Sequence, residues 1–138
     1  MSAPACIFCT LIAGRAPVSI VESDEHVVAF LDAFPVAPGH VLVSPRRHVE
    51  SLSELTVEEG AALFASARRL AGRVRERLAP AVNLHLSDGA EADQEVPHVH
   101  LHVIPRHAGD QVVLDLPGTR RTRQELDEVA AALTASPD

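Results

Sequence analysis

Three histidines stand at two-residue intervals in the segment Pro97–Arg106, which reads Pro-His-Val-His-Leu-His-Val-Ile-Pro-Arg. Because successive side chains of a β-strand point to opposite faces, this spacing predicts that His98, His100 and His102 share one face. The aliphatic residues between and after them, expected to fill the core, are Val99, Leu101 and Val103. Imidazole titrates near neutral pH and serves as nucleophile, acid–base group or metal ligand. Three imidazoles about 7 Å apart along one strand therefore predict a chemical site.

A second candidate is the pair of cysteines Cys6 and Cys9, the only two in the chain. Two cysteines are too few for a disulfide framework. A thioredoxin-like redox pair needs a strand–turn–helix setting that this N-terminal stretch lacks. The pair is also compatible with two buried structural thiols, or with half of a tetrahedral zinc site that needs two more nitrogen or sulfur ligands.

Composition limits the class of protein. The 138 residues are 46% hydrophobic and 22% charged, which predicts a single globular domain over residues 1–138. A net charge of −7 argues against a nucleic-acid partner, although a small anionic ligand stays compatible with it. No apolar run approaches the roughly 18 residues that span a bilayer, so we expect no membrane partner. The start of the chain, Met1–Ala5, lacks the features of a signal peptide, and we expect a cytoplasmic protein.

The elements that must position these residues follow from periodicity and punctuation. A short helix is predicted over residues 6–13, and Thr56 with Glu59 forms a capping box that opens a helix to about Leu78. Thr122 with Glu125 opens a final helix over about residues 123–134. The β-rich runs cover residues 18–22, 26–31, 40–44 and 81–86, followed by a polar loop over 87–96 and the histidine strand. Short links between the strands favour an α+β domain built on an antiparallel sheet.

The histidine segment resembles the signature of the histidine triad (HIT) family, which comprises nucleotide-binding hydrolases and transferases. The resemblance covers about residues 5–110. Further matching segments, in family order, are Cys6-Ile-Phe-Cys9, Phe30-Leu-Asp32, Ala37-Pro-Gly-His40-Val-Leu-Val, Arg47-His48-Val and Gln94-x-Val-x-His98. The loop and tail around the triad are similar to those of the fragile-histidine-triad branch. The resemblance implies a five-stranded antiparallel sheet with one long helix and short terminal helices, and a homodimer whose sheets join.

The resemblance also implies an enzyme that acts at an α-phosphate. His100 is then the nucleophile that forms a nucleotidyl-histidine intermediate, and His102 hydrogen-bonds the phosphoryl oxygens. His40 either completes this catalytic cluster or is a polar residue at a strand entrance. The expected substrates are nucleoside phosphoramidates, dinucleoside polyphosphates or related nucleotide conjugates.

Zinc-bearing members of the family, and the related galactose-1-phosphate uridylyltransferases, are similar to this chain around the two cysteines. The positions that match their other two ligands are His48 and His98. The resemblance therefore implies a structural zinc ion on Cys6, Cys9, His48 and His98, and in that case His98 fixes the strand without touching the phosphate.

Several further positions match nucleotide-contacting positions of the family. Asp32 matches the acid that accepts both ribose hydroxyls, and its alternative interpretation is a turn residue at a strand end. Ser87 and Gln94 match positions around the phosphate. The apolar positions that match a nucleobase slot, and that are equally typical of plain core, are Ile7, Phe8, Leu11 and Phe30.

The chain departs from the family pattern in the loop before the triad. The family usually places Asn or Gln at Ser87, Gly at Asp93 and Ser or Thr at Glu95. We hypothesise that Asp93 faces the phosphate and helps to select the leaving group. An intact triad favours an enzyme, whereas this altered loop favours a zinc-stabilised nucleotide-binding module with little turnover that acts through partners.

Overall fold

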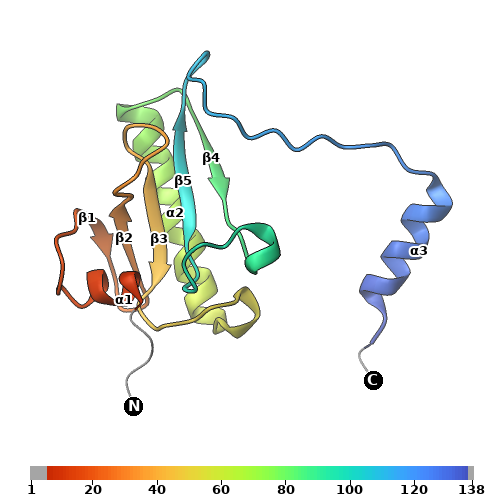
Figure 1. Ribbon diagram of the computed structural model, residues 1–138, viewed down its shortest axis with the longest axis horizontal. Helices are drawn as coiled ribbons and strands as arrows, with labels where there is room; N and C mark the ends of the chain where they lie inside the picture. The colour runs from red at the N-terminus through yellow and green to blue at the C-terminus, as the bar shows by residue number, and fades with distance from the viewer. Residues whose placement is uncertain (1–5, 137–138) are drawn as a thin grey trace.

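The computed structural model describes residues 6–136, and its centre is a five-stranded antiparallel sheet in the order β1-β2-β3-β5-β4 (Figure 1). The strands are β1 (Ile20–Ser23), β2 (Val27–Leu31), β3 (Val41–Pro45), β4 (Ala81–His85) and β5 (Leu101–Arg106). The α-helices are α1 (Ile7–Ile12), α2 (Val57–Arg77) and α3 (Arg123–Thr134), and the 3-10 turns are η1 (Leu52–Glu54) and η2 (Ala90–Ala92). The predicted α+β class, sheet and long helix are confirmed.

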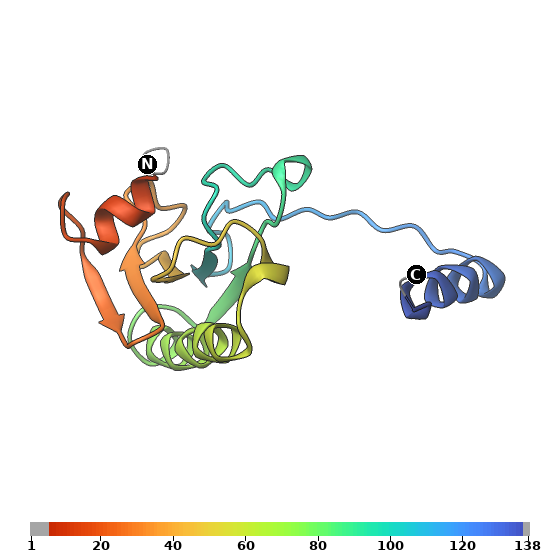
Figure 2. The ribbon, with the colours of Figure 1, turned by 90° about the horizontal axis from the view of Figure 1, so that it is seen from below.

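Helix α2 covers one face of the sheet, and α1 lies on the opposite face (Figure 2). The predicted capping box opens α2: the Glu59 N–H donates to Thr56 Oγ1, and the Thr56 N–H donates to the Glu59 carboxylate. Leu63, Leu70 and Val74 are buried on one side of this helix at the expected helical spacing. Helix α2 therefore packs against the central strands and fixes their position from that face.

The central strands are two-faced, as their alternation predicts. The residues that pack between the sheet and α2 include Val27, Ala29, Val41, Val43, Val99, Leu101 and Val103. Their neighbours Val28, Phe30 and Leu42 pack on the other face with Phe8 of α1. Leu42 pairs with His102 across β3 and β5, so His102 also lies on the α1 face. The aliphatic side chains of the histidine segment thus pack into the core on the α2 side, and its imidazoles lie on the face toward α1.

One boundary differs from the sequence prediction. Strand β5 begins at Leu101, so His98 and His100 precede it and only His102 is a strand residue. The segment is nevertheless extended and fixed, because the Val99 N–H donates to the carbonyl of Val49 and Ser44 Oγ donates to the carbonyl of Val99. The imidazoles of His98, His100 and His102 therefore still lie on one face, although pairing with β3 begins only at Leu101.

The C-terminal helix forms where Thr122 predicts it, with Thr122 Oγ1 accepting the Glu125 N–H. It lies apart from the sheet at the end of an extended segment (Figure 1). Among the described residues, no helix combines the length and apolar character needed to span a bilayer. One domain over 1–138 stays a prediction, and Met1–Ala5, on which the signal-peptide argument rests, lies outside the described residues.

Candidate functional site

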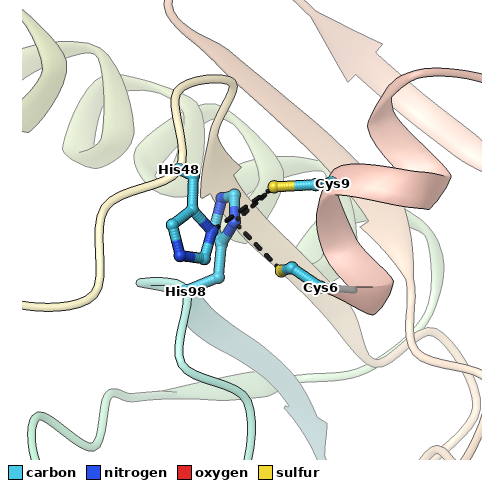
Figure 3. Close-up of side chains that lie close together, drawn as sticks. All are labelled: Cys6, Cys9, His48 and His98. Carbon is cyan, nitrogen blue, oxygen red and sulfur yellow. Dashed lines mark hydrogen bonds between the residues drawn. The ribbon is translucent and has the colours of Figure 1, made fainter. Parts of the chain in front are cut away.

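Two cysteines and two histidines from three distant segments meet beside the start of α1 (Figure 3). Cys6 immediately precedes α1 and Cys9 lies within it, while His48 follows β3 and His98 precedes β5. The Sγ atoms of Cys6 and Cys9 both lie 3.5 Å from His98 Nδ1, and Cys9 Sγ lies 3.4 Å from His48 Nδ1. His98 is fully buried and Cys6 is 7% exposed. The four predicted metal ligands are therefore brought together.

The hydrogen bonds of His98 and His48 determine which ring nitrogen of each imidazole has a lone pair free to bind a metal. His98 Nε2 lies 2.8 Å from the carbonyl of Pro45 and must donate to it. His48 Nε2 lies 3.4 Å from the Glu50 carboxylate, which only accepts when ionised. In both rings the proton is thus on Nε2, and the Nδ1 lone pair faces the sulfurs. Such outer hydrogen bonds are the usual means by which proteins orient histidine ligands.

The spacing matches a tetrahedral metal centre. With Zn–S of about 2.3 Å, Zn–N of about 2.0 Å and tetrahedral angles, sulfur and nitrogen ligands are about 3.5 Å apart. The observed separations of 3.4 and 3.5 Å agree with this value. Burial lowers the pKa of His98, which keeps its imidazole neutral, and burial together with Cys6 raises the pKa of the Cys9 thiol. A divalent cation between them would favour both thiolates. The donor set fits zinc.

The remaining histidines of the triad form a row with His40. His100 and His102 have ring centroids 5.0 Å apart, and those of His102 and His40 are 5.1 Å apart. His40 is 3% exposed and His100 is 8% exposed. The Phe8 ring stands edge-on to His100, 4.9 Å away between centroids, and 5.9 Å from His98. Phe8 of α1 therefore contacts both groups: the metal cluster through His98 and the histidine row through His100.

Tautomers along this row follow from fixed donors and acceptors. The Val36 N–H donates to His40 Nδ1, so the His40 proton is on Nε2 and is donated to His102 Nδ1 at 2.8 Å. The His102 proton is then on its own Nε2, free to donate outward. In His100 the Nδ1–H donates to the His98 carbonyl at 2.7 Å, which leaves its Nε2 with a lone pair. The row therefore presents the lone pair of His100 Nε2 as a nucleophile, beside the His102 Nε2–H as a hydrogen-bond donor.

Burial is the main cause that lowers the pKa of His102 to about 4, with smaller contributions from His100, His40 and His85. Burial also lowers the pKa of His40, although Asp32, 3.7 Å away, opposes this effect. Both rings are consequently neutral at pH 7, in agreement with the tautomers that their hydrogen bonds require. The neutral His40 therefore keeps its Nε2–H for His102 Nδ1, and the neutral His102 keeps one N–H donor of its own.

Known proteins of similar sequence and structure identify the family of this chain. A family model described as HIT domain matches residues 13–109. The chain belongs to the histidine triad (HIT) family. An uncharacterized HIT-like protein of Methanocaldococcus jannaschii is 37% identical over 124 residues, which are 90% of this chain and 95% of that protein. A crystal structure of a HIT family member from Bacillus subtilis is similar with a TM-score of 0.89 and 31% identity, covering 98% of this chain and 100% of that one.

A zinc-bound histidine triad family protein from Mycobacterium smegmatis is also similar, with a TM-score of 0.75 and 33% identity over 93% of this chain and 97% of that one. The HIT family binds nucleotides, and its members are typically nucleotide hydrolases. Family membership, predicted from the triad, is confirmed. The closer similarity to the fragile-histidine-triad branch stays a prediction.

The residues predicted to bind the nucleotide differ in exposure, and Asp32 and Phe8 contact the HIT histidine row. The Asp32 carboxylate accepts the Phe34 N–H at 2.9 Å, as a turn residue does, and its other oxygen lies near His40. Phe8 and Phe30 are buried with ring centroids 5.4 Å apart, and Leu11 packs against the same cluster. Ile7 is 51% exposed. For these positions both the nucleotide-binding and the structural interpretation stay open.

The loop before the triad is held by Gln94. Gly89 N–H donates to Gln94 Oε1 at 2.7 Å, and Gln94 Nε2 donates to the carbonyls of Glu50 and Val96. Asp93 has φ 63 and ψ 36, the left-handed conformation that favours glycine. Asp93 and Glu95 are exposed. Their orientation toward a phosphate stays a hypothesis.

Sequence reasoning missed two residues that the HIT fold places at the site. His85 pairs with His102 across β4 and β5, with ring centroids 5.5 Å apart, and its Nε2 lies 3.3 Å from Ser87 Oγ. Glu50 is the outer partner of His48. The alternation of β4 predicts the face of His85, but only the register between the strands reveals its partner.

Proposed function

We propose that this HIT protein transfers or hydrolyses a nucleotidyl group at the α-phosphate through a covalent intermediate on His100. The observation that carries the proposal is the hydrogen bond from His100 Nδ1 to the His98 carbonyl, which leaves the Nε2 lone pair available. His98 itself is held by the Pro45 carbonyl and faces the cysteines, so the nucleophile rests on a fixed support.

The proposed reaction has two steps. His100 Nε2 attacks the α-phosphorus, the Nε2–P bond forms, and the bond to the leaving group breaks with its electron pair. Water or another acceptor then attacks the phosphorus, the Nε2–P bond breaks with its electron pair returning to Nε2, and the nucleotide is released. The proton that the acceptor loses passes through solvent to the departed leaving group. His102 Nε2–H donates to a phosphoryl oxygen as its charge develops in both steps. The chain His40–His102 fixes that proton, because His40 can only donate to His102 Nδ1.

The substrate class that we propose comprises nucleoside phosphoramidates, dinucleoside polyphosphates and related conjugates. Turnover of adenosine and guanosine members of both classes by the purified protein tests it. His100→Ala is expected to abolish turnover while leaving nucleotide affinity and the unfolding transition near those of the native chain. His107→Ala, a change at an exposed histidine of the same chain, is the matched control and should keep full turnover. Full activity of His100→Ala would contradict the proposal.

A second candidate function is a zinc-stabilised nucleotide-binding module with little turnover. The observation that favours it is the loop of residues 87–96, where Asp93 and Glu95 add negative charge and the Gln94 amide is fully engaged with backbone groups. Measurable nucleotide binding by calorimetry, together with no turnover of any substrate in the panel, would favour this second function.

We further propose that Cys6, Cys9, His48 and His98 hold one structural zinc ion per chain. When bound, zinc would contribute directly to folding by joining α1 to the segments before β5 and after β3. Thiolate ligands require reduced cysteines, which is consistent with the cytoplasmic location that we propose. We also propose that the protein is a homodimer, because the sheet has edges whose unpaired backbone groups a second copy can pair.

A further inference from the structure

His85 is an imidazole beside the histidine row that the proposed reaction does not use. It is the last residue of β4 and pairs in register with His102 of β5, so both side chains lie on the same face of the sheet. Their ring centroids are 5.5 Å apart, close to the 5.0 Å that separates His102 from His100. His85 is exposed to solvent, whereas His40 and His100 are buried. An exposed imidazole next to the row can exchange protons with water.

The proposed reaction needs a group that carries a proton. An amine leaves phosphorus readily only when its nitrogen takes up a proton, because an amide anion is a very strong base. The water that attacks in the second step must in turn lose a proton. Imidazole is the side chain best suited to both tasks near neutral pH, and a positioned acid–base group typically contributes about 10²–10⁴-fold to the rate.

The row itself cannot fill this role, because each of its imidazoles is held in one protonation state. The Val36 N–H can only donate, and it fixes the His40 proton on Nε2. His40 in turn donates to His102 Nδ1, so a second proton on either ring would bring two N–H groups together. His100 keeps its Nε2 for the attack on phosphorus, since its Nδ1–H donates to the His98 carbonyl. Burial, which lowers the pKa of His40 and of His102, acts in the same direction.

The hydrogen-bond partner of His85 places no such limit on it. His85 Nε2 lies 3.3 Å from Ser87 Oγ, and a hydroxyl oxygen can accept an N–H. This bond can form with the neutral ring and with the imidazolium alike, because Nε2 carries a proton in both. Among residues 6–136, Ser87 is the one hydrogen-bonding partner of the His85 ring. The Nδ1 atom of His85 is therefore available to gain and lose a proton.

We propose that His85 is the general acid–base residue of this site, an inference that rests on the proposed nucleotidyl transfer through His100. In the first step the Nδ1–H of the His85 imidazolium protonates the leaving nitrogen, directly or through one water. The P–N bond breaks with its electron pair on that nitrogen, which departs as a neutral amine. In the second step neutral His85 takes the proton that the attacking water loses, and the imidazolium is regenerated. His85 thus carries between the two steps the proton that otherwise passes through solvent.

Two substrates with different leaving groups test the proposal in the full-length protein. An adenosine phosphoramidate of an alkylamine needs a proton at its leaving nitrogen, whereas the nitrophenyl ester of AMP releases nitrophenolate, which is a stable anion. His85→Gln keeps a polar side chain but cannot carry the proton. It should lower kcat/KM at least about 100-fold on the phosphoramidate and less than about 5-fold on the ester. The reason is that kcat/KM includes only the steps up to departure of the leaving group.

A second measurement follows the intermediate on His100. With the nitrophenyl ester, His85→Gln should release about one nitrophenolate per chain in a burst and then turn over slowly, because hydrolysis of the intermediate has lost its base. Free imidazole should restore phosphoramidate turnover by His85→Ala at least about tenfold. Because His85 is exposed, both variants should keep the unfolding transition of the native chain.

His107→Gln, a change at an exposed histidine after β5, is the matched control and should keep both kcat/KM values and show no response to imidazole. Equal losses on the two substrates in His85→Gln, or no loss on either, overturn the acid–base role of His85 and leave the nucleophile His100 standing. Absence of turnover of both substrates by the native chain instead contradicts the proposed function, and the inference falls with it.

Discussion

Replacing Glu59 by glutamine tests how the long helix supports the metal cluster. The Glu59 carboxylate accepts Arg47 Nε at 3.0 Å, Arg47 Nη2 at 2.7 Å and the Thr56 N–H at 2.9 Å. Hydrogen bonding from Arg47 is the main cause that lowers its pKa from 4.5 to about 2. Arg47 directly precedes the metal-ligand candidate His48, so this ion pair connects α2 to the metal cluster.

The magnitude follows from the pKa difference. The fall of the Glu59 pKa from 4.5 to about 2 corresponds to at most about 3.4 kcal/mol of stability at pH 7. The Arg47 side chain is 52% exposed, so solvent screening reduces the expected loss for Glu59→Gln to about 1–2 kcal/mol. Because the folded-state pKa is depressed, this contribution is complete above pH 4.5 and disappears as the pH falls toward 2. Below that pH the two proteins should be equally stable.

Urea unfolding at pH 7 and at pH 3, with zinc at saturation, measures the difference in the free energy of unfolding. Glu58→Gln, at the exposed neighbouring position in the first turn of α2, is the control and should cost less than about 0.5 kcal/mol. Glu59→Gln should also release metal to a chelator faster than the control. Equal stability of the two variants at pH 7 would refute the proposed link between α2 and the cluster.

Three further outcomes are expected. Protein purified without chelator should contain about one zinc per chain by elemental analysis, and Cys6→Ser should lower both zinc content and melting temperature; less than about a tenth of an equivalent in the native chain would refute the metal site. Proton NMR should show His102 titrating near pH 4, and because its folded-state pKa lies below the unfolded value of 6.5, its contribution to stability should be lost as the pH falls from 6.5 to 4; titration near pH 6.5 would contradict the buried row. Asp93→Gly should stabilise the chain by about 1 kcal/mol by relieving the left-handed conformation, and should raise kcat/KM on generic nucleoside phosphoramidates, with a smaller gain for Glu95→Ser; unchanged kcat/KM on every substrate would mean that Asp93 is only a solvated loop residue.

Local signals in the sequence predicted most of the fold. The capping residues Thr56 and Thr122 stand at the helix starts that the structure shows, because a hydroxyl that accepts the N3 backbone N–H is a short-range feature. The start of β5 was predicted too early, since strand pairing depends on the neighbouring strand β3, whose ladder to β5 begins at Leu101. Alternation alone gives the faces of a strand but not where its partner ends.

The sequence predicts which residues form the candidate site, but it does not predict which nitrogens of its histidines carry protons. The four metal-ligand candidates were expected from spacing and family resemblance, and they do meet. The tautomers of His100 and His102 depend on acceptors such as the His98 carbonyl and donors such as Val36 N–H, which only the folded backbone places. The position of His85 depends likewise on the register between β4 and β5, and the path of the chain after β5 depends on the Arg106–Asp110 ion pair.

Trapping the covalent intermediate tests the central claim most directly. The protein is mixed with an adenosine phosphoramidate for a time shorter than one turnover, quenched in base, digested and analysed by mass spectrometry. The account predicts one adenylylated peptide with the added group on His100, absent from His100→Ala and present in His107→Ala. Adenylylation of another residue, or single-turnover product formation with no modified peptide at any time, would contradict it.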